Sequence, residues 1–272
     1  MIDQLRQRAR ELLSNGEVAV VIGYGNESAP EPVFITRPED SYLLIFNAEC
    51  RNNLAVYLTR PEIRGMGSIA LVAKPADIKA AFVLMQENQV APESLHIIGV
   101  DTDADGGFVV LPQRTHAELL DYMLKNKQPS ELSEADLDDV AALEKLTDAQ
   151  RWDYWQAQFS KCIRCYACRQ VCPLCYCSRC VAEKNRPQWI ETSAHGRGNL
   201  AWNITRAFHL AGRCIECGEC ERVCPAGIPL MMLNRKLAKE VRDAFGYVPG
   251  YALTGDQFFA GYRPGDPNDF FE

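Results

Sequence analysis

Apolar positions in the first part of the chain alternate between helical spacing and short runs. Residues 2–13 carry their apolar side chains on one helical face, and Asn15-Gly16 ends that helix. Short apolar runs predict buried strands at residues 17–22, 42–46, 68–73 and 95–100. A helix from Pro75 to about Asn88 separates the last two strands, which implies parallel pairing through a right-handed crossover. The pattern predicts an α/β domain with a mostly parallel sheet over residues 1–128.

Beyond residue 128 the apolar spacing is that of helices. Residues 129–160 form an acidic linker that ends in an aromatic-rich helix. Helical spacing recurs at 198–211 and 229–240, so we expect an all-α domain over residues 161–242. The last segment, 243–272, is rich in glycine, proline and aromatic residues. It predicts an extended tail that docks onto a partner surface or packs along its own domain.

The spacing of the cysteines is the most specific feature of the sequence. The run Cys162-x2-Cys165-x2-Cys168-x3-Cys172-Pro recurs as Cys214-x2-Cys217-x2-Cys220-x3-Cys224-Pro. This spacing is typical of proteins that hold two [4Fe-4S] clusters, in which the fourth cysteine of each run binds the other cluster. We therefore predict two interlocked ligand sets. The first is Cys162, Cys165, Cys168 and Cys224, and the second is Cys214, Cys217, Cys220 and Cys172.

Structural zinc is the main alternative for these eight cysteines. Zinc sites use paired ligands and need neither a third cysteine at the same short spacing nor a following Cys-Pro. Disulfides are disfavoured because the polar start of the chain, residues 1–10, carries no secretory signal. The spacing therefore favours iron–sulfur clusters.

Four cysteines are surplus to the two clusters: Cys50, Cys175, Cys177 and Cys180. Four thiolates are enough for a third [4Fe-4S] cluster or for a tetrahedral zinc site. Cys50 can join the others only if the α/β domain folds back onto the cysteine-rich region. The alternative is that all four are free thiols.

Composition and charge exclude some classes of function. The formal net charge of −7 disfavours binding to a phosphate backbone, so we expect no nucleic-acid partner. No apolar stretch is long enough for a transmembrane helix, and we expect a cytoplasmic protein.

Weaker motifs add little. Gly23-Tyr24-Gly25 after a predicted strand hints at a dinucleotide loop, but the third glycine is missing, because Ser28 takes its place. The four histidines show no paired metal-ligand spacing. No catalytic residues are predicted.

The cysteine-rich region, from Cys162 to about Leu237, resembles the α-helical ferredoxin domain of succinate dehydrogenase and heterodisulfide reductase iron–sulfur subunits. Both complete cysteine runs, the helical spacer and the phrase CGECERVCPAGIPL carry this resemblance. It implies two [4Fe-4S] clusters that relay single electrons.

The N-terminal part resembles the beta-subunit family of deazaflavin-reducing hydrogenases and formate dehydrogenases, through GSIALVAKPADIKAAF, LHIIGVD and CIRCYACRQVCPLCYCSRC. The family uses flavin. It also carries cysteines where this chain has Ala76 and near Thr102, so those possible ligands are absent here.

The resemblances imply an electron-transfer subunit of a cytoplasmic anaerobic oxidoreductase complex. Its partners would be other redox subunits, and it would act as a relay rather than as the catalytic subunit. One alternative is a flavin-containing (FAD) subunit that itself reduces NAD(P) or a deazaflavin coenzyme. Another is an adaptor whose clusters only hold the fold.

Overall fold

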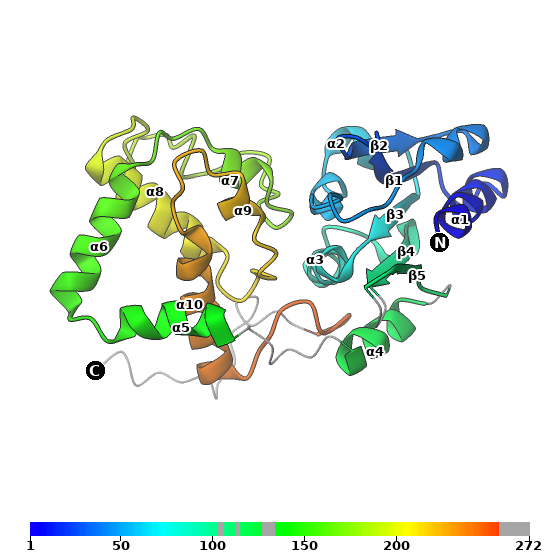
Figure 1. Cartoon of the computed structure of the whole chain (residues 1–272). Coiled ribbons are helices and arrows are strands. Elements are labelled where there is room, and N and C mark those ends of the chain that lie inside the picture. The colour runs from blue at the N-terminus through cyan, green and yellow to red at the C-terminus, as the bar shows by residue number, and fades with distance from the viewer. Residues whose placement is uncertain (103–105, 113–114, 127–133, 256–272) are drawn as a thin grey trace.

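The computed structural model describes residues 1–102, 106–112, 115–126 and 134–255. The chain forms two lobes, an α/β lobe from the first part of the sequence and a helical lobe that contains both cysteine runs (Figure 1).

A sheet of five strands forms the centre of the α/β lobe. Its strands run in the order β2-β1-β3-β4-β5. They are β1 (Val20–Gly25), β2 (Glu31–Ile35), β3 (Ile69–Ala73), β4 (Leu95–Thr102) and β5 (Phe108–Val110). The pairs β1–β3 and β3–β4 are parallel, as the strand–helix–strand pattern predicts. Both edge strands are antiparallel to their neighbours.

The expectation of a mostly parallel sheet is therefore wrong, and the sheet is mixed. Only residues 26–30 connect β1 to β2, and only residues 103–107 connect β4 to β5. Connections this short allow a hairpin but no crossover, so each edge strand must return antiparallel. The sequence does not reveal β2, because its apolar run of Val33, Phe34 and Ile35 is short and follows Pro32, which disfavours a strand.

Helical segments cover the sheet. They are α1 (Ile2–Ser14), η1 (Pro38–Leu43), η2 (Leu54–Tyr57), α2 (Pro61–Arg64), α3 (Pro75–Gln86), η3 (Pro92–Ser94) and α4 (His116–Asn126). The strand predicted at residues 42–46 is also wrong. That stretch is the end of η1 followed by a single bridge between Ile45 and Tyr24. Tyr42 and Leu43 stay largely exposed, so the apolar run there does not mark a buried strand.

The central elements of this lobe are largely buried. All five residues of β3 are buried, and α3 buries eight of its twelve residues. Pro75 occupies the first turn of α3, and the carboxylate of Asp77 accepts the backbone N–H of Lys74 at 3.0 Å, which closes the helix start.

The second lobe consists of helices and loops. Its helices are α5 (Glu134–Glu144), α6 (Asp148–Ser160), α7 (Ala167–Gln170), α8 (Gly196–His209), α9 (Glu219–Arg222) and α10 (Leu230–Phe245). Helix α6 packs against α8, and α10 packs against α5, α8 and α9. Helix α10 is longer than the predicted 229–240. It ends at Gly246, whose positive φ of 63° terminates the last turn.

The final segment begins by folding back. Tyr251 and Leu253 pack against the core of the α/β lobe, and Lys79 Nζ lies 5.6 Å from the centre of the Tyr251 ring. Residues 256–272 lie outside the described residues, so the docking role of the tail stays a prediction.

None of the helices in the described part of the chain combines the length and the apolar character needed to cross a bilayer.

Candidate iron–sulfur site

The two cysteine runs adopt the same backbone conformation. In the first run Arg164 and Tyr166, on either side of Cys165, have φ near +60°. The corresponding residues of the second run, Glu216 and Gly218, have φ of 60° and 76°. Each loop then enters a one-turn helix, α7 or α9, that starts at the same position of the repeat.

Left-handed conformations at residues other than glycine are unfavourable unless the surroundings require them. Alternation of left- and right-handed residues turns successive backbone N–H groups toward one side, and such concavities are used at many iron–sulfur sites. Both runs therefore form concave loops that are lined by backbone N–H groups and cysteine sulfurs.

The four cysteines predicted for the second cluster come together. Cys172, Cys214, Cys217 and Cys220 line one small cavity, together with Asn234 and Arg206. The side-chain amide of Asn234 donates to Cys220 Sγ at 3.6 Å. The fourth cysteine of the first run thus lies among the first three cysteines of the second run.

The cysteines predicted for the first cluster are also neighbours. Cys162, Cys168 and Cys224 pack around one small apolar cluster formed by Phe159, Cys220, Ile228, Leu230 and Met231. Cys165 is exposed, and its charge is among those felt by Cys168. The buried amide of Asn199 donates to the carbonyl oxygens of Phe159 (3.0 Å) and Cys162 (2.8 Å), which fixes the start of this loop against α8.

Burial controls the protonation of the thiols. It raises the pKa of Cys168 to about 11 and that of Cys217 to about 12, and it raises the pKa of Cys214 as well. Such thiols stay protonated at neutral pH unless a cation binds, because coordination to a metal removes the proton. The donor set therefore suits a metal cluster and contains no carboxylate that would favour a hard cation.

Arg206 of α8 is the charged group between the two sets. Its side chain is buried, and Nη2 donates to the carbonyl oxygen of Cys168 at 2.9 Å. Burial lowers the pKa of this guanidinium, but the sulfurs of Cys175, Cys172, Cys220 and Cys168, once ionised, outweigh burial and raise it. A fixed positive charge therefore lies beside cysteines of both runs. The sequence alone does not reveal this charge, because an arginine inside an amphipathic helix usually faces solvent.

A site for a single metal ion would look different. Within the described ranges of the chain, no three cysteine, histidine, aspartate or glutamate side chains converge as the ligands of one ion would. The thiolates of a cube bind different irons and stand farther apart than ligands that share one ion.

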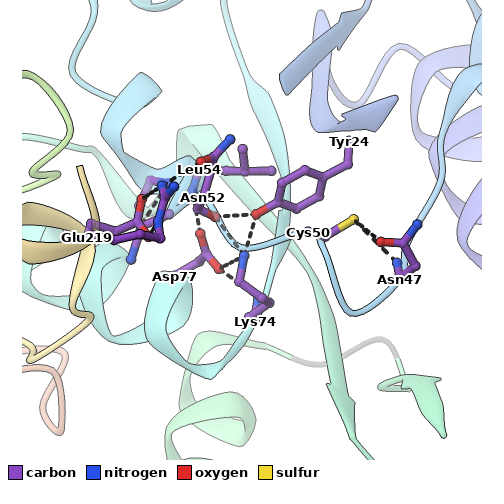
Figure 2. Close-up of polar contacts among 11 residues, drawn as sticks. Tyr24, Asn47, Cys50, Asn52, Leu54, Lys74, Asp77 and Glu219 are labelled. Carbon is purple, nitrogen blue, oxygen red and sulfur yellow. Dashed lines mark hydrogen bonds and ion pairs between the residues drawn. The ribbon is translucent and has the colours of Figure 1, made fainter. Parts of the chain in front are cut away.

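The surplus cysteines divide into two places. Cys175, Cys177 and Cys180 line a cavity of about 300 Å³ next to α8. Cys50 is buried in the α/β lobe, where Asn47 donates its backbone N–H to the sulfur at 3.3 Å (Figure 2). Cys50 does not line the cavity that the other three share.

A polar network lies where the two lobes meet (Figure 2). Lys74, directly after β3, donates to the carbonyl oxygen of Asn52 at 2.7 Å and to the hydroxyl of Tyr24, and it pairs with the buried carboxylate of Asp77 at 3.1 Å. From the other lobe, Arg222 of α9 donates to the side chain of Asn52 at 2.8 Å.

Further contacts hold the second run against the α/β lobe. Arg213, just before Cys214, forms a bidentate ion pair with Glu87, in which the distance between Nη2 and Oε2 is 2.7 Å. Arg60 donates to the carbonyl oxygen of Gln170 at 3.1 Å. Leu174, Leu210 and Ile215 join the core of the α/β lobe. The second ligand set therefore lies at the interface between the lobes.

The glycines of Gly23-Tyr24-Gly25 do not form a turn. They lie within β1, where side chains of Leu44 and Val72 pack against Gly23 and Val33 packs against Gly25. Their role is close packing.

Comparison with known proteins agrees with this geometry. The family model of the 4Fe-4S dicluster domain matches residues 158–228. The F420-dependent formate dehydrogenase subunit beta of Methanocaldococcus jannaschii is 39% identical over 97 residues, 35% of this chain and 25% of that protein. The F420-dependent formate dehydrogenase 1 subunit beta of Methanococcus maripaludis is 36% identical over 96 residues, 35% of this chain and 24% of that protein.

The chain thus spans about a quarter of the length of these curated relatives. Residues 158–228 form a 4Fe-4S dicluster domain, and about a third of the chain is homologous to the beta subunit of F420-dependent formate dehydrogenases.

Proposed function

We propose that this chain is an iron–sulfur electron-transfer subunit of an oxidoreductase complex. Cys162, Cys165, Cys168 and Cys224 hold one [4Fe-4S] cluster, and Cys214, Cys217, Cys220 and Cys172 hold the other. The partners are other redox subunits, which is in keeping with relatives that are themselves named as beta subunits of a formate dehydrogenase.

One observation carries this proposal. Cys172 lines the same cavity as the three leading cysteines of the second run, although forty-one residues separate the two runs. Exchange of the fourth ligand requires the two clusters to be neighbours, and neighbouring one-electron centres give a short path for charge.

When bound, the clusters would supply reversible single-electron transfer. The chain itself sets their surroundings. Phe159, Met231 and neighbouring apolar side chains cover three cysteines of the first set, and Arg206 supplies a fixed positive charge to both sets. These are the features by which a protein tunes such centres.

The two sets have different access to partners. Cys165 and its neighbour Ile163 are exposed, and Ile163 is 62% exposed. The first set is therefore open to a partner at the surface. The second set faces the α/β lobe, so we propose that an outside partner exchanges electrons with the first set and that they pass from there between the two sets.

Analysis of protein purified without oxygen tests the proposal. We expect at least about eight irons with matching sulfide per chain, and two paramagnetic centres that couple magnetically in a redox titration. Flavin in the same preparation would favour the alternative of a subunit that itself reduces a nicotinamide or deazaflavin coenzyme. Clusters that resist all low-potential donors would favour an adaptor without electron transfer.

Two single substitutions separate interlocked from independent clusters. We expect C172S to remove the signal of the second set and to leave the first. The C50S variant, which changes a buried cysteine outside both sets, should keep both signals. A C172S protein that loses only the first signal would refute the shared ligation.

A further inference from the structure

The inference concerns the cavity of about 300 Å³ that lies between the first cysteine run and α8. Three cysteines line it, Cys175, Cys177 and Cys180, and none of them belongs to the two sets described above. Three soft ligands on one cavity wall, in a segment of six residues, indicate a metal centre rather than general packing.

The walls suit a negatively charged cluster. Trp202, Leu174 and Leu210 supply apolar surface, and three arginines, Arg169, Arg206 and Arg213, supply positive charge. The side chain of Arg206 is 5% exposed, and its Nε has no hydrogen-bond partner among the described residues. An anionic occupant of the cavity would therefore stabilise this buried guanidinium.

The cysteine segment is held in place before any ligand binds. Arg169 donates to the carbonyl oxygen of Cys177 at 2.8 Å and pairs with Glu183 at 2.7 Å. Arg213 lies over the ring of Tyr176, 4.9 Å from its centre, while it is fixed to Glu87 of the other lobe. Preorganised ligands of this kind are expected at a binding site.

The spread of the ligands favours a cluster over a single zinc ion. A zinc ion draws four ligand atoms to within about 2.3 Å of one point, and the described side chains show no such convergence.

The fourth ligand comes from α8 rather than from the α/β lobe. His209, at the end of α8, lines the same cavity. Cys50 does not line it, and its charged neighbours are Lys74 and Glu49, with no other cysteine among them. The expectation that Cys50 completes this set therefore finds no support in the geometry.

We propose that Cys175, Cys177, Cys180 and His209 hold a third [4Fe-4S] cluster. This inference rests on the proposed electron-transfer function and extends it. The backbone N–H of Cys175 donates to the carbonyl oxygen of Cys172 at 3.2 Å, so the third centre would adjoin the second set and lengthen the path through the chain.

Metal content of anaerobic wild-type protein is the first test. We expect about twelve irons and twelve sulfides per chain, with less than one zinc. Eight irons would overturn the third cluster while leaving the two-cluster relay intact. Eight irons with one zinc would also overturn it, in favour of a zinc site.

Variants of the cysteines and the histidine that line the cavity test where the third cluster binds. The double variant C177S/C180S should lose about one third of the iron and one paramagnetic signal, and should keep the signals of both interlocked clusters. H209C should retain the iron, whereas H209A should lose part of it. The C50S variant is the control and should retain about twelve irons.

Two results of this series would overturn the assignment. One is unchanged iron in C177S/C180S, and the other is loss of a third of the iron in C50S. The iron content of the wild-type protein does not depend on any variant. The proposal can therefore be refuted even if a variant folds poorly.

Discussion

The α/β lobe and the cysteine-bearing lobe differ in what holds them together. The first has one continuous apolar core in which β3 and most of α3 are completely buried. The second has two small buried clusters, one of Phe159, Cys220, Ile228, Leu230 and Met231, and one of Ala182, Ile190 and Trp202. Cysteines of the first run border both of them.

This difference indicates that the stability of the two lobes depends on different forces. Hydrophobic burial alone orders the sheet and its helices. In the other lobe the apolar area is limited, and metal binding supplies folding free energy when ligands are brought together only in the folded state. Perturbations should therefore affect the lobes unequally.

Removal of iron should have the largest effect. We expect chelation under reducing conditions to lower the free energy of unfolding of the cysteine-bearing lobe by several kcal/mol and to leave the sheet folded, because its strands and helix α3 carry no metal ligand of the two sets. Hydrogen exchange measured separately for β3 and α8 checks this. Equal loss of protection in both helix and strand would contradict the comparison.

A cavity in the sheet should produce the opposite pattern. Leu71 in β3 is fully buried, so L71A should destabilise the α/β lobe by about 2–5 kcal/mol. Iron content should not change. The exposed Val181 is 55% accessible, and V181A serves as a control that should stay within about 0.5 kcal/mol of wild type. Loss of iron in L71A would mean that the lobes fold as one unit.

Loss of the charge on Arg206 should act on the clusters rather than on the fold. Removal of a buried positive charge disfavours the more negative, reduced state, so R206M should lower the reduction potentials. One charge at about 6 Å, with an effective dielectric constant of about 20, corresponds to about 100 mV.

Two controls sharpen this test. R206K keeps the charge and should restore most of the potential. R197Q removes a charge that is 89% exposed and should shift the potential by less than about 20 mV because water screens it. A potential unchanged in R206M would show that this guanidinium serves only packing.

The ion pair between the lobes should give the smallest effect. The side chains of Glu87 and Arg213 are 8% and 19% exposed, so E87Q leaves a mostly buried charge unpaired. We expect a loss of about 1–3 kcal/mol in unfolding free energy. E49Q breaks the exposed pair with Arg51 and should cost less than about 0.5 kcal/mol. Equal effects in chemical denaturation would mean that the interface contributes no stability.

Much of the fold could be predicted from local patterns. The strand–helix–strand unit from β3 to β4 and the helices α1, α6 and α8 lie close to their predicted positions, because apolar periodicity reports which side of an element is buried. The edge strands could not be predicted, since the apolar runs within β2 and β5 are only three residues long and these strands are only partly buried. The apolar run at residues 42–46 led to a wrong strand prediction because two of its side chains, Tyr42 and Leu43, are exposed.

The cysteine spacing by itself determined the chemistry of the site, because thiolates at that repeat suit iron–sulfur clusters and little else. The tertiary structure alone decided which thiols are buried, which charge lies between the two sets and where the surplus cysteines lie. Arg206 and the separation of Cys50 from Cys175, Cys177 and Cys180 depend on how α8 and the two lobes pack. A linear pattern records ligand types and spacings, whereas distances between remote segments are fixed only when the chain folds.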